Sequence, residues 1–256
     1  MRKIFLFIVL LITMSVFSQD QNNGTAARVE YKIINNTGLP NTLYATLFID
    51  NEVSIYFEKY STKKHISNST NENVVIRPPK FLFEPYTKFD HKKKQVQLFE
   101  SINAKIFLVE DNYIMPDWTI TNESKVIAEY PCIKATTTFR GKKWIAWFAP
   151  QVPLSCGPWK LHGLPGLIME SSDVDGFYTM QVEKIEFVKD AIFEKDFKTL
   201  YSSKNNKPIT YQKYLQDYND YLENTRIEIM NEKKDIYMPL TVKSNMDKEL
   251  VFEWDK

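Results

Sequence analysis

Glycine, cysteine and histidine are scarce in this chain of 256 residues, which contains seven, two and three of them respectively. Two cysteines are too few for a disulfide-rich scaffold, and no Cys-x-x-Cys motif is present to lower a thiol pKa. Three widely spaced histidines do not supply the ligands of a transition-metal site. Glycine-rich phosphate loops, His-Glu pairs and Gly-x-Ser-x-Gly elbows are also missing. We therefore expect no metal and no cofactor, and the sequence favours a protein without catalytic activity.

A long apolar run occurs only near the N-terminus, where Met1-Arg2-Lys3 precedes residues 4–17. A basic start, a short apolar stretch and the small residue Ser18 are typical of a cleaved secretory signal, predicted here over residues 1–18. A retained anchor helix is the alternative, but the run is short for a bilayer span. No cysteine lies near the cleavage point to carry a lipid. The sequence thus predicts a periplasmic or secreted protein that is soluble after signal cleavage.

Charge of one sign is not in excess either. The formal net charge is +1, and loss of the two cations of the signal changes it to −1. A near-neutral surface offers no electrostatic footprint for nucleic acid or for an anionic membrane. We therefore expect no nucleic-acid partner, and residues 19–256 fit one domain.

Short runs of β-branched and aromatic residues, separated by polar or Pro/Gly-containing turns, dominate residues 28–188. No alternation of helix and strand patterns appears that would support a parallel sheet. This pattern predicts a mainly β fold, in which a curved antiparallel meander sheet forms a half-barrel or open barrel. The runs expected to form strands include residues 29–33, 42–48, 53–57, 105–109, 118–120 and 126–128.

The clearest hairpin is predicted over residues 133–148, with residues 140–143 as its turn. On its second strand, Trp144 and Phe148 alternate with Trp147 and therefore face the opposite side of the sheet. A further strand is predicted near residues 177–187, where the apolar alternation changes phase after Val182. Such a phase change indicates a β-bulge.

Near the C-terminus the apolar period changes, because tyrosines and leucines recur at helical spacing. We predict a long amphipathic helix over residues 210–231, with Thr210 as its N-cap. Its tyrosine stripe either packs against the sheet, which we favour, or covers a ligand pocket. Polar residues 61–73 are expected to form a solvated loop, with a mobile lid as the alternative.

Aromatic and turn residues are concentrated in residues 118–176, which hold four of the five tryptophans and five of the seven glycines. At its centre, residues 157–168 contain a Pro-Gly pair that predicts a type II turn and three apolar side chains that fold back on it. The segment is either a structural loop that plugs one end of the sheet or a binding loop. The candidate ligand- or partner-binding residues are Trp118, Trp144, Trp147, Trp159, Lys160 and His162, and the candidate structural residues are Gly157, Pro158, Gly163, Leu164, Pro165, Gly166, Leu167 and Ile168.

The stretch Gly163-Leu164-Pro165-Gly166-Leu167-Ile168 resembles the motif of the GLPGLI family of exported bacterial envelope proteins. The resemblance is strong over residues 118–173 and loose elsewhere. It implies an exported, β-rich envelope protein. It implies no catalytic residue, because the family has no established activity. Other segments that resemble the family pattern, in order, are residues 118–120, 130–135, 139–141, 146–148 and 157–160, together with Pro153 and Asp173.

Cys132 and Cys156 are left as a possible disulfide. In an oxidising compartment a lone pair invites a bridge, which would close a loop of about 24 residues and contribute about 3 kcal/mol. Cys132 fits the family pattern whereas Cys156 departs from it. Together with His162 and Asp173, Cys132 also suggests a thiol enzyme, but no nucleophile-positioning turn surrounds it.

Three functional hypotheses follow. The favoured one is an envelope protein that binds a hydrophobic or lipid-like small molecule, or a peptide, in the concavity of its sheet near the candidate tryptophans. The second is a docking partner of an outer-membrane protein complex, in which residues 157–168 make the contact. The third and least favoured is a thiol enzyme or hydrolase.

Overall fold

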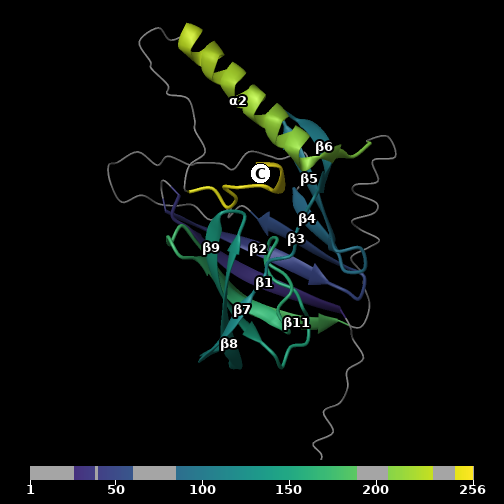
Figure 1. Cartoon of the computed structure of the whole chain (residues 1–256), viewed down its shortest axis with the longest axis vertical. Coiled ribbons are helices and arrows are strands. Elements are labelled where there is room, and N and C mark those ends of the chain that lie inside the picture. The colour runs from purple at the N-terminus through teal and green to yellow at the C-terminus, as the bar shows by residue number, and fades with distance from the viewer. Residues whose placement is uncertain (1–25, 38–39, 60–84, 189–206, 233–245, 256) are drawn as a thin grey trace, which may run out of the picture.

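The computed structural model of the chain describes residues 26–37, 40–59, 85–188, 207–232 and 246–255 (Figure 1). The expected signal peptide over residues 1–18 and the polar segment over residues 61–73 lie outside these ranges. The described strands are β1 (Ala26–Asn35), β2 (Asn41–Ile49), β3 (Val53–Lys59), β4 (Tyr86–Asp90), β5 (Gln95–Ile102), β6 (Lys105–Asp111), β7 (Thr119–Ile127), β8 (Tyr130–Phe139), β9 (Lys142–Ala149), β10 (Leu167–Asp173), β11 (Tyr178–Val188) and β12 (Ile209–Thr210). They are followed by the helix α2 (Tyr211–Glu232) and the short 3-10 helix η1 (Glu253–Asp255).

All twelve of these strands belong to one sheet, in the order β12-β6-β5-β4-β3-β2-β1-β11-β10-β9-β8-β7. The pairs are antiparallel apart from the short parallel contact between β12 and β6. Strand β1 lies in the middle, with β2 on one side and β11 on the other. The chain therefore builds one half of the sheet outward from β1 and the other half back toward it, which confirms the predicted antiparallel meander.

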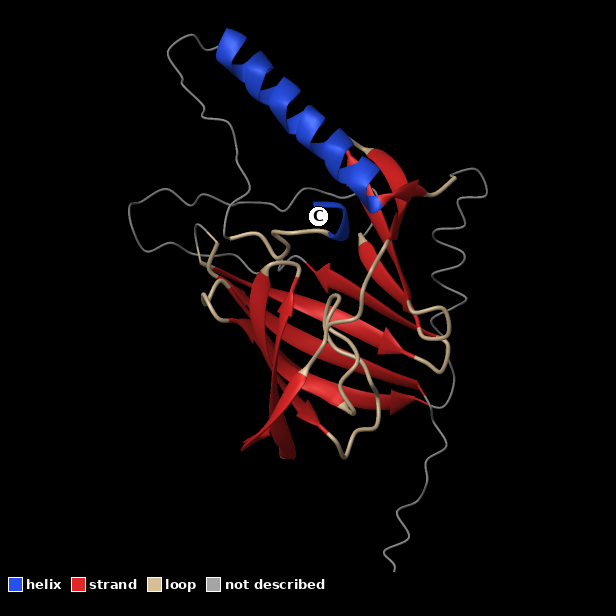
Figure 2. Ribbon diagram, viewed as in Figure 1, coloured by secondary structure: helices blue, strands red, loops and turns tan. Residues whose placement is uncertain are grey.

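The connection from β6 to β7 requires the sheet to curl. These two strands lie ten strand spacings apart in the sheet order, which would be about 48 Å in a flat sheet. Only residues 112–118 join them, and seven extended residues span at most about 23–25 Å. The two edges must therefore approach each other, and the strands form the curved, open body in Figure 2.

Two local predictions are decided by the strand register. The β8–β9 hairpin has a turn of two residues, Arg140 and Gly141, rather than the predicted four, and both have positive φ angles of 47° and 80°. Such turns match the twist of the paired strands, so that the ladder continues to the tip. In β11 the bulge is confirmed: Val182 pairs with Tyr31 and Lys184 with Glu30, which leaves the intervening residue unpaired.

The core occupies the inner face of the curled sheet. On β1, residues 29, 31 and 33 alternate toward this face and are buried. Trp144 and Phe148 of β9 lie on the same side and are almost fully buried, whereas Trp147 is half-buried on the other face, as predicted. The hydroxyl of Tyr31 donates a hydrogen bond to the carbonyl of Ile168 at 2.8 Å, which ties β1 to the start of β10.

The helix α2 is the predicted C-terminal amphipathic helix. The amide of Lys213 donates to Oγ1 of Thr210 at 3.2 Å, as expected for an N-cap. The beginning of α2 packs beside β5 and β6, and the remainder projects away from the sheet (Figure 1). The final segment, residues 246–255, lies between α2 and the body of the sheet. Within the described ranges, no helix has the length and apolar character needed to cross a membrane.

Candidate ligand-binding cavity

Residues 157–168, the centre of the segment singled out in the sequence, form a closed part of the core. Leu164, Leu167 and Ile168 are at most 1% exposed. The amide of Leu167 donates to the carbonyl of Val152 at 2.9 Å, and that of Ile168 to the carbonyl of Cys156 at 2.9 Å. Only positions 163 and 165 of this loop are exposed. The loop therefore presents little surface to a docking partner.

The turn at Pro165 differs from the predicted type II turn. The amide of Gly166 donates to the carbonyl of Leu164 at 2.8 Å, which closes a three-residue γ-turn centred on the proline. A Cβ atom at Gly166 would lie 2.3 Å from the carbonyl oxygen of Ala149. Glycine is required here because the loop crosses the end of β9 at backbone contact distance.

The candidate binding residues of the sequence do not gather at one site. Trp118 donates its indole NH to the carbonyl of His162 at 2.8 Å and is half-buried. Trp144 is buried against Trp159, with ring centroids 5.7 Å apart. Trp147 lies on the outer face, where the ammonium of Lys125 stands 4.4 Å from its ring centroid. Only Trp159 and Lys160 line the cavity described below.

His162 is enclosed by aromatic rings rather than exposed to a ligand. It is 1% exposed, and its ring stacks on Phe89 at a centroid distance of 4.3 Å and an interplanar angle of 12°. Tyr113 meets it edge-on at 6.4 Å. Burial lowers the pKa of His162 to about 3, with a smaller contribution from His91. The imidazole is therefore neutral at physiological pH.

Cys132 and Cys156 are both buried and both carry free thiols. The disulfide that the sequence left open is thus not formed in this structure. Burial raises the pKa of Cys132, and it raises that of Cys156 to about 12. Since the thiolate is the nucleophilic form, neither environment activates a thiol for catalysis.

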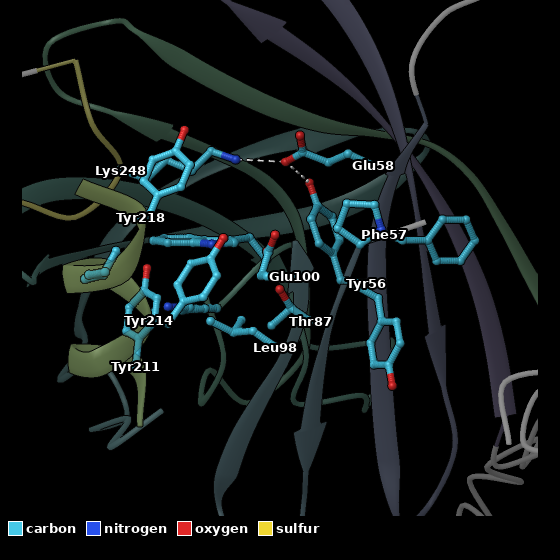
Figure 3. Close-up of a pocket in the computed structure, with 15 residues that line it drawn as sticks. Tyr56, Phe57, Glu58, Thr87, Leu98, Glu100, Tyr211, Tyr214, Tyr218 and Lys248 are labelled. Atoms are coloured by element: carbon cyan, nitrogen blue, oxygen red, sulfur yellow. Dashed lines mark hydrogen bonds and ion pairs between the residues drawn. The ribbon is translucent and has the colours of Figure 1, made fainter. Parts of the chain in front are cut away.

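A cavity of about 330 Å³ lies under the beginning of α2, between the helix, strands β3 to β5 and the C-terminal segment (Figure 3). Its walls combine aromatic rings with charged groups. The lining residues are Tyr56, Phe57, Glu58, Pro85, Tyr86, Thr87, Leu98, Glu100, Trp159, Lys160, Tyr211, Tyr214, Leu215, Tyr218 and Lys248. The tyrosine stripe of α2 therefore faces a pocket as well as the sheet, which the sequence reasoning considered but did not favour.

An ionic network fixes the C-terminal segment beside this cavity. The guanidinium of Arg140 binds both oxygens of Asp111, with nitrogen–oxygen distances of 2.6 and 3.0 Å. It also contacts Glu249, and it binds both oxygens of Glu253 at 3.0 and 3.1 Å. The ammonium of Lys160 lies 2.7 Å from Asp111 and 2.9 Å from Glu249. Burial opposes ionisation of Asp111, but the two cations outweigh it and the pKa of this carboxyl is lowered.

Two further carboxyl groups enter the cavity from the sheet. Glu58 on β3 accepts a hydrogen bond from Lys248 at 2.8 Å and one from the hydroxyl of Tyr56 at 3.2 Å (Figure 3). Burial tends to raise the pKa of Glu58, but Lys248 outweighs it and the pKa is lowered. Glu100 on β5 has no hydrogen bond or ion pair within the described part of the chain, and burial raises its pKa to about 7. The cavity thus holds one carboxylate that is neutralised by a partner and one that is not.

Sequence reasoning missed most of the residues that line the cavity. Glu58 lies just beyond the strand predicted over residues 53–57, and Glu100 lies in a stretch for which no strand was predicted. The sequence did contain one sign of the cavity, the stripe of Tyr211, Tyr214 and Tyr218. Each of these rings carries a hydroxyl group that needs a hydrogen-bond partner if it is buried in a closed core. Within the described residues, no group of three or more His, Cys, Asp or Glu side chains is arranged to hold a metal ion.

Comparisons with known proteins identify similar folds, but they indicate no activity for this chain. A family model described as a protein of unknown function (Porph_ging) matches residues 139–170, a segment that includes Gly163 to Ile168. Two crystal forms of PNGF-II resemble the chain with a TM-score of 0.54, at 19% and 18% identity, over 78% and 77% of this chain. The chain spans about a third of the length of PNGF-II, 33% and 34% in the two forms. At this identity the likeness shows a shared fold.

Two weaker likenesses also occur. An uncharacterised conserved protein from Thermus thermophilus aligns with 75% of this chain and 93% of its own, at 10% identity and a TM-score of 0.39. A DUF1329 family protein from Desulfovibrio piger aligns with 70% of this chain and 92% of its own, at 8% identity and a TM-score of 0.25. Among curated proteins, none matches the sequence.

Proposed function

We propose that the chain is a non-catalytic protein of the bacterial envelope that binds a small ligand in the cavity under α2. The observation that carries this proposal is the cavity itself, whose volume of about 330 Å³ is at the lower end of the range for small-molecule sites. Its lining mixes aromatic faces with a few convergent polar groups, as such sites do.

The lining also narrows the kind of ligand. Tyr211, Tyr214 and Trp159 offer flat apolar faces, while Glu58, Glu100, Lys160 and Lys248 are charged. Three of these groups are paired with opposite charges, whereas Glu100 has no hydrogen-bond or ion-pair partner among the described residues. A purely hydrocarbon ligand would remove water from Glu100 without supplying a partner, which is costly. The ligand therefore has an apolar or ring-shaped body with at least one polar group. This is a smaller class than the hydrophobic molecules, lipid-like molecules and peptides expected from the sequence.

The location in the envelope rests on the N-terminal sequence and on the family resemblance. Residues 1–18 have the pattern of a cleaved signal, and residues 163–168 spell the motif of the exported GLPGLI proteins. We infer membership of that family, and a periplasmic or secreted product, from these two features together.

The experiment is native mass spectrometry of protein purified under gentle conditions, with a variant that fills the cavity. Leu215→Trp places an indole in the lining, whereas Leu222→Trp makes the same change on the exposed part of the same helix. We expect a bound small molecule on the wild type and on Leu222→Trp, and its loss from Leu215→Trp.

Circular dichroism checks that both variants are folded. If Leu215→Trp does not fold, Thr87→Met replaces it, because this variant fills the cavity from β4. Protein that carries no small molecule and gains none from a panel of amines, sugars and fatty acids would contradict the proposal. So would a molecule that both folded cavity-filling variants retain.

A further inference from the structure

We propose that the ligand of this cavity is a small organic cation, a primary amine or a quaternary ammonium, which pairs with Glu100. This inference rests on the proposed function and adds the chemical class of the ligand. Three features of the cavity lead to it: the balance of charge, the isolation of one carboxylate, and the tyrosine rings beside that carboxylate.

The charge balance of the cavity and its adjoining network is negative. The carboxylates number five, and the cations that bind them number three. With all groups ionised, the difference is two negative charges. Each cation already contacts at least one of the other four carboxylates, and none of the three forms an ion pair with Glu100. The carboxylates are Glu58, Glu100, Asp111, Glu249 and Glu253, and the cations are Arg140, Lys160 and Lys248.

Glu100 is the carboxylate left for the ligand. It lines the cavity, points into it in Figure 3 and has no hydrogen-bond or ion-pair partner among the described residues. The charged and titratable groups that face it are Lys160 from the loop, Glu58 from β3, Lys248 from the C-terminal segment and Tyr214 from α2. Both lysines are held by other carboxylates. An unpaired, half-buried carboxylate is costly, and a cation that reaches it offsets that cost.

The wall opposite Glu100 is suited to a cation. Tyr211, Tyr214 and Tyr218 lie on one face of α2 with near-parallel rings, at centroid distances of 6.3 and 6.2 Å. The ammonium of Lys160 already stands 4.1 Å from the ring centroid of Tyr211. In the described part of the chain, the rings of Tyr214 and Tyr218 have no cation over them. Faces of aromatic rings attract ammonium groups, most strongly where water is excluded.

The test compares choline with 3,3-dimethylbutan-1-ol, which has the same shape without the charge, by isothermal titration calorimetry. n-Butylammonium serves as the primary-amine probe. We expect the ammonium probes to bind at least about tenfold more tightly than the neutral alcohol. Binding should strengthen about tenfold between about pH 6 and about pH 8, since Glu100 loses its proton over this range.

Two variants locate the effect. Glu100→Gln should weaken ammonium binding about tenfold and remove most of its pH dependence, and Tyr214→Leu should weaken it several-fold. Glu123→Gln, which removes a carboxylate of the outer surface on β7, should leave binding unchanged. The wild type and all three variants are compared by thermal unfolding, so that a loss of binding is not mistaken for a loss of fold.

The outcomes separate this inference from the proposed function. If the neutral alcohol, methyl glucoside or decanoate binds the wild type as well as choline or better, the cation inference is overturned and the cavity remains a ligand site. If no probe binds and no small molecule is retained, both fail. Equal binding of choline by the wild type and Glu100→Gln would also overturn the inference.

Discussion

Burial shifts the titration of both His162 and Glu100 toward the neutral form, yet the two side chains lie in different kinds of surroundings. His162 is enclosed by Phe89 and Tyr113, and its pKa falls to about 3. Glu100 faces a cavity, and its pKa rises to about 7. Aromatic rings enclose the first group, whereas the second borders a cavity. A perturbed pKa therefore points to a binding site only when the group also borders open volume.

The two regions also differ in how the chain builds them. Residues 157–168 are one continuous loop whose backbone hydrogen bonds are made at close range, including those to residues 152 and 156. The cavity is assembled from separate parts of the chain: β3, β4 and β5, the loop, α2 and the C-terminal segment all contribute side chains. In the first region, glycine and tryptophan lie close together in the sequence and pack tightly. In the second region, tyrosine and glutamate come from distant parts of the sequence and line the cavity.

The largest effect is expected from the network that joins the two regions. Arg140→Ala removes the guanidinium that binds Asp111, Glu249 and Glu253, and leaves their charges buried without this partner. We expect a loss of about 3–5 kcal/mol in the free energy of unfolding, measured by urea denaturation. The comparison variant is Lys92→Ala, which breaks an exposed pair with Glu52 and should cause no measurable loss. Similar losses in the two variants would show that the network does not hold the C-terminal segment.

A smaller effect is expected from the loop. Gly166→Ala places a Cβ 2.3 Å from the carbonyl oxygen of Ala149, so that the backbone must move. We expect the free energy of unfolding to fall by about 1–3 kcal/mol. The substitution changes none of the residues that line the cavity. Gly176→Ala is the matched control, because its φ of 78° is also positive but nothing lies within 4 Å of the added atom. A loss at Gly166 no greater than at Gly176 would argue against close packing of this loop.

The smallest effect concerns the pH dependence of stability. The pKa of His162 is lowered in the folded state, so the unfolded state binds a proton that the folded state does not. Its contribution to stability is therefore complete at neutral pH and is lost as the pH falls below the unfolded value of about 6.5. Between about pH 6 and about pH 5 the loss should be about 1 kcal/mol.

His162→Phe keeps a flat ring on Phe89 and removes this titration. In this variant, the free energy of unfolding should therefore fall by about 1 kcal/mol less between about pH 6 and about pH 5 than it does in the wild type. Urea denaturation at the two pH values measures this difference. An unchanged pH dependence would mean that His162 is not held neutral by burial.

Much of the architecture was predictable because strand periodicity is a local property. The hairpin, the phase change after Val182 and the N-cap at Thr210 were each read from fewer than about twenty neighbouring residues. Strands β4 and β5 were not predicted. Their short alternations contain Lys88, Gln95 and Gln97, and such half-polar runs differ little from loops until a neighbouring strand covers one face.

The candidate site was predicted in part. Trp159 and Lys160 line the cavity, and the tyrosine stripe of α2 was recognised as one that either packs or covers a pocket. Trp118, Trp144, Trp147 and His162 lie elsewhere. Trp144 and His162 are buried in the core, Trp118 is half-buried against the loop, and Trp147 lies on the outer face of the sheet. Residue type alone does not separate a ring that fills the core from a ring that lines a cavity.

By itself the sequence determined the class of the fold, the export-type N-terminal pattern and the tight loop at Gly166, since each depends on residues adjacent in the chain. Only the tertiary structure decided where the cavity forms. Glu58, Glu100 and Lys248 are separated by up to 190 residues, and they meet because the sheet curls and the C-terminal segment is held beneath α2. A charge that long-range packing leaves unpaired is not visible in the local pattern, because its partners are fixed only when the chain has folded.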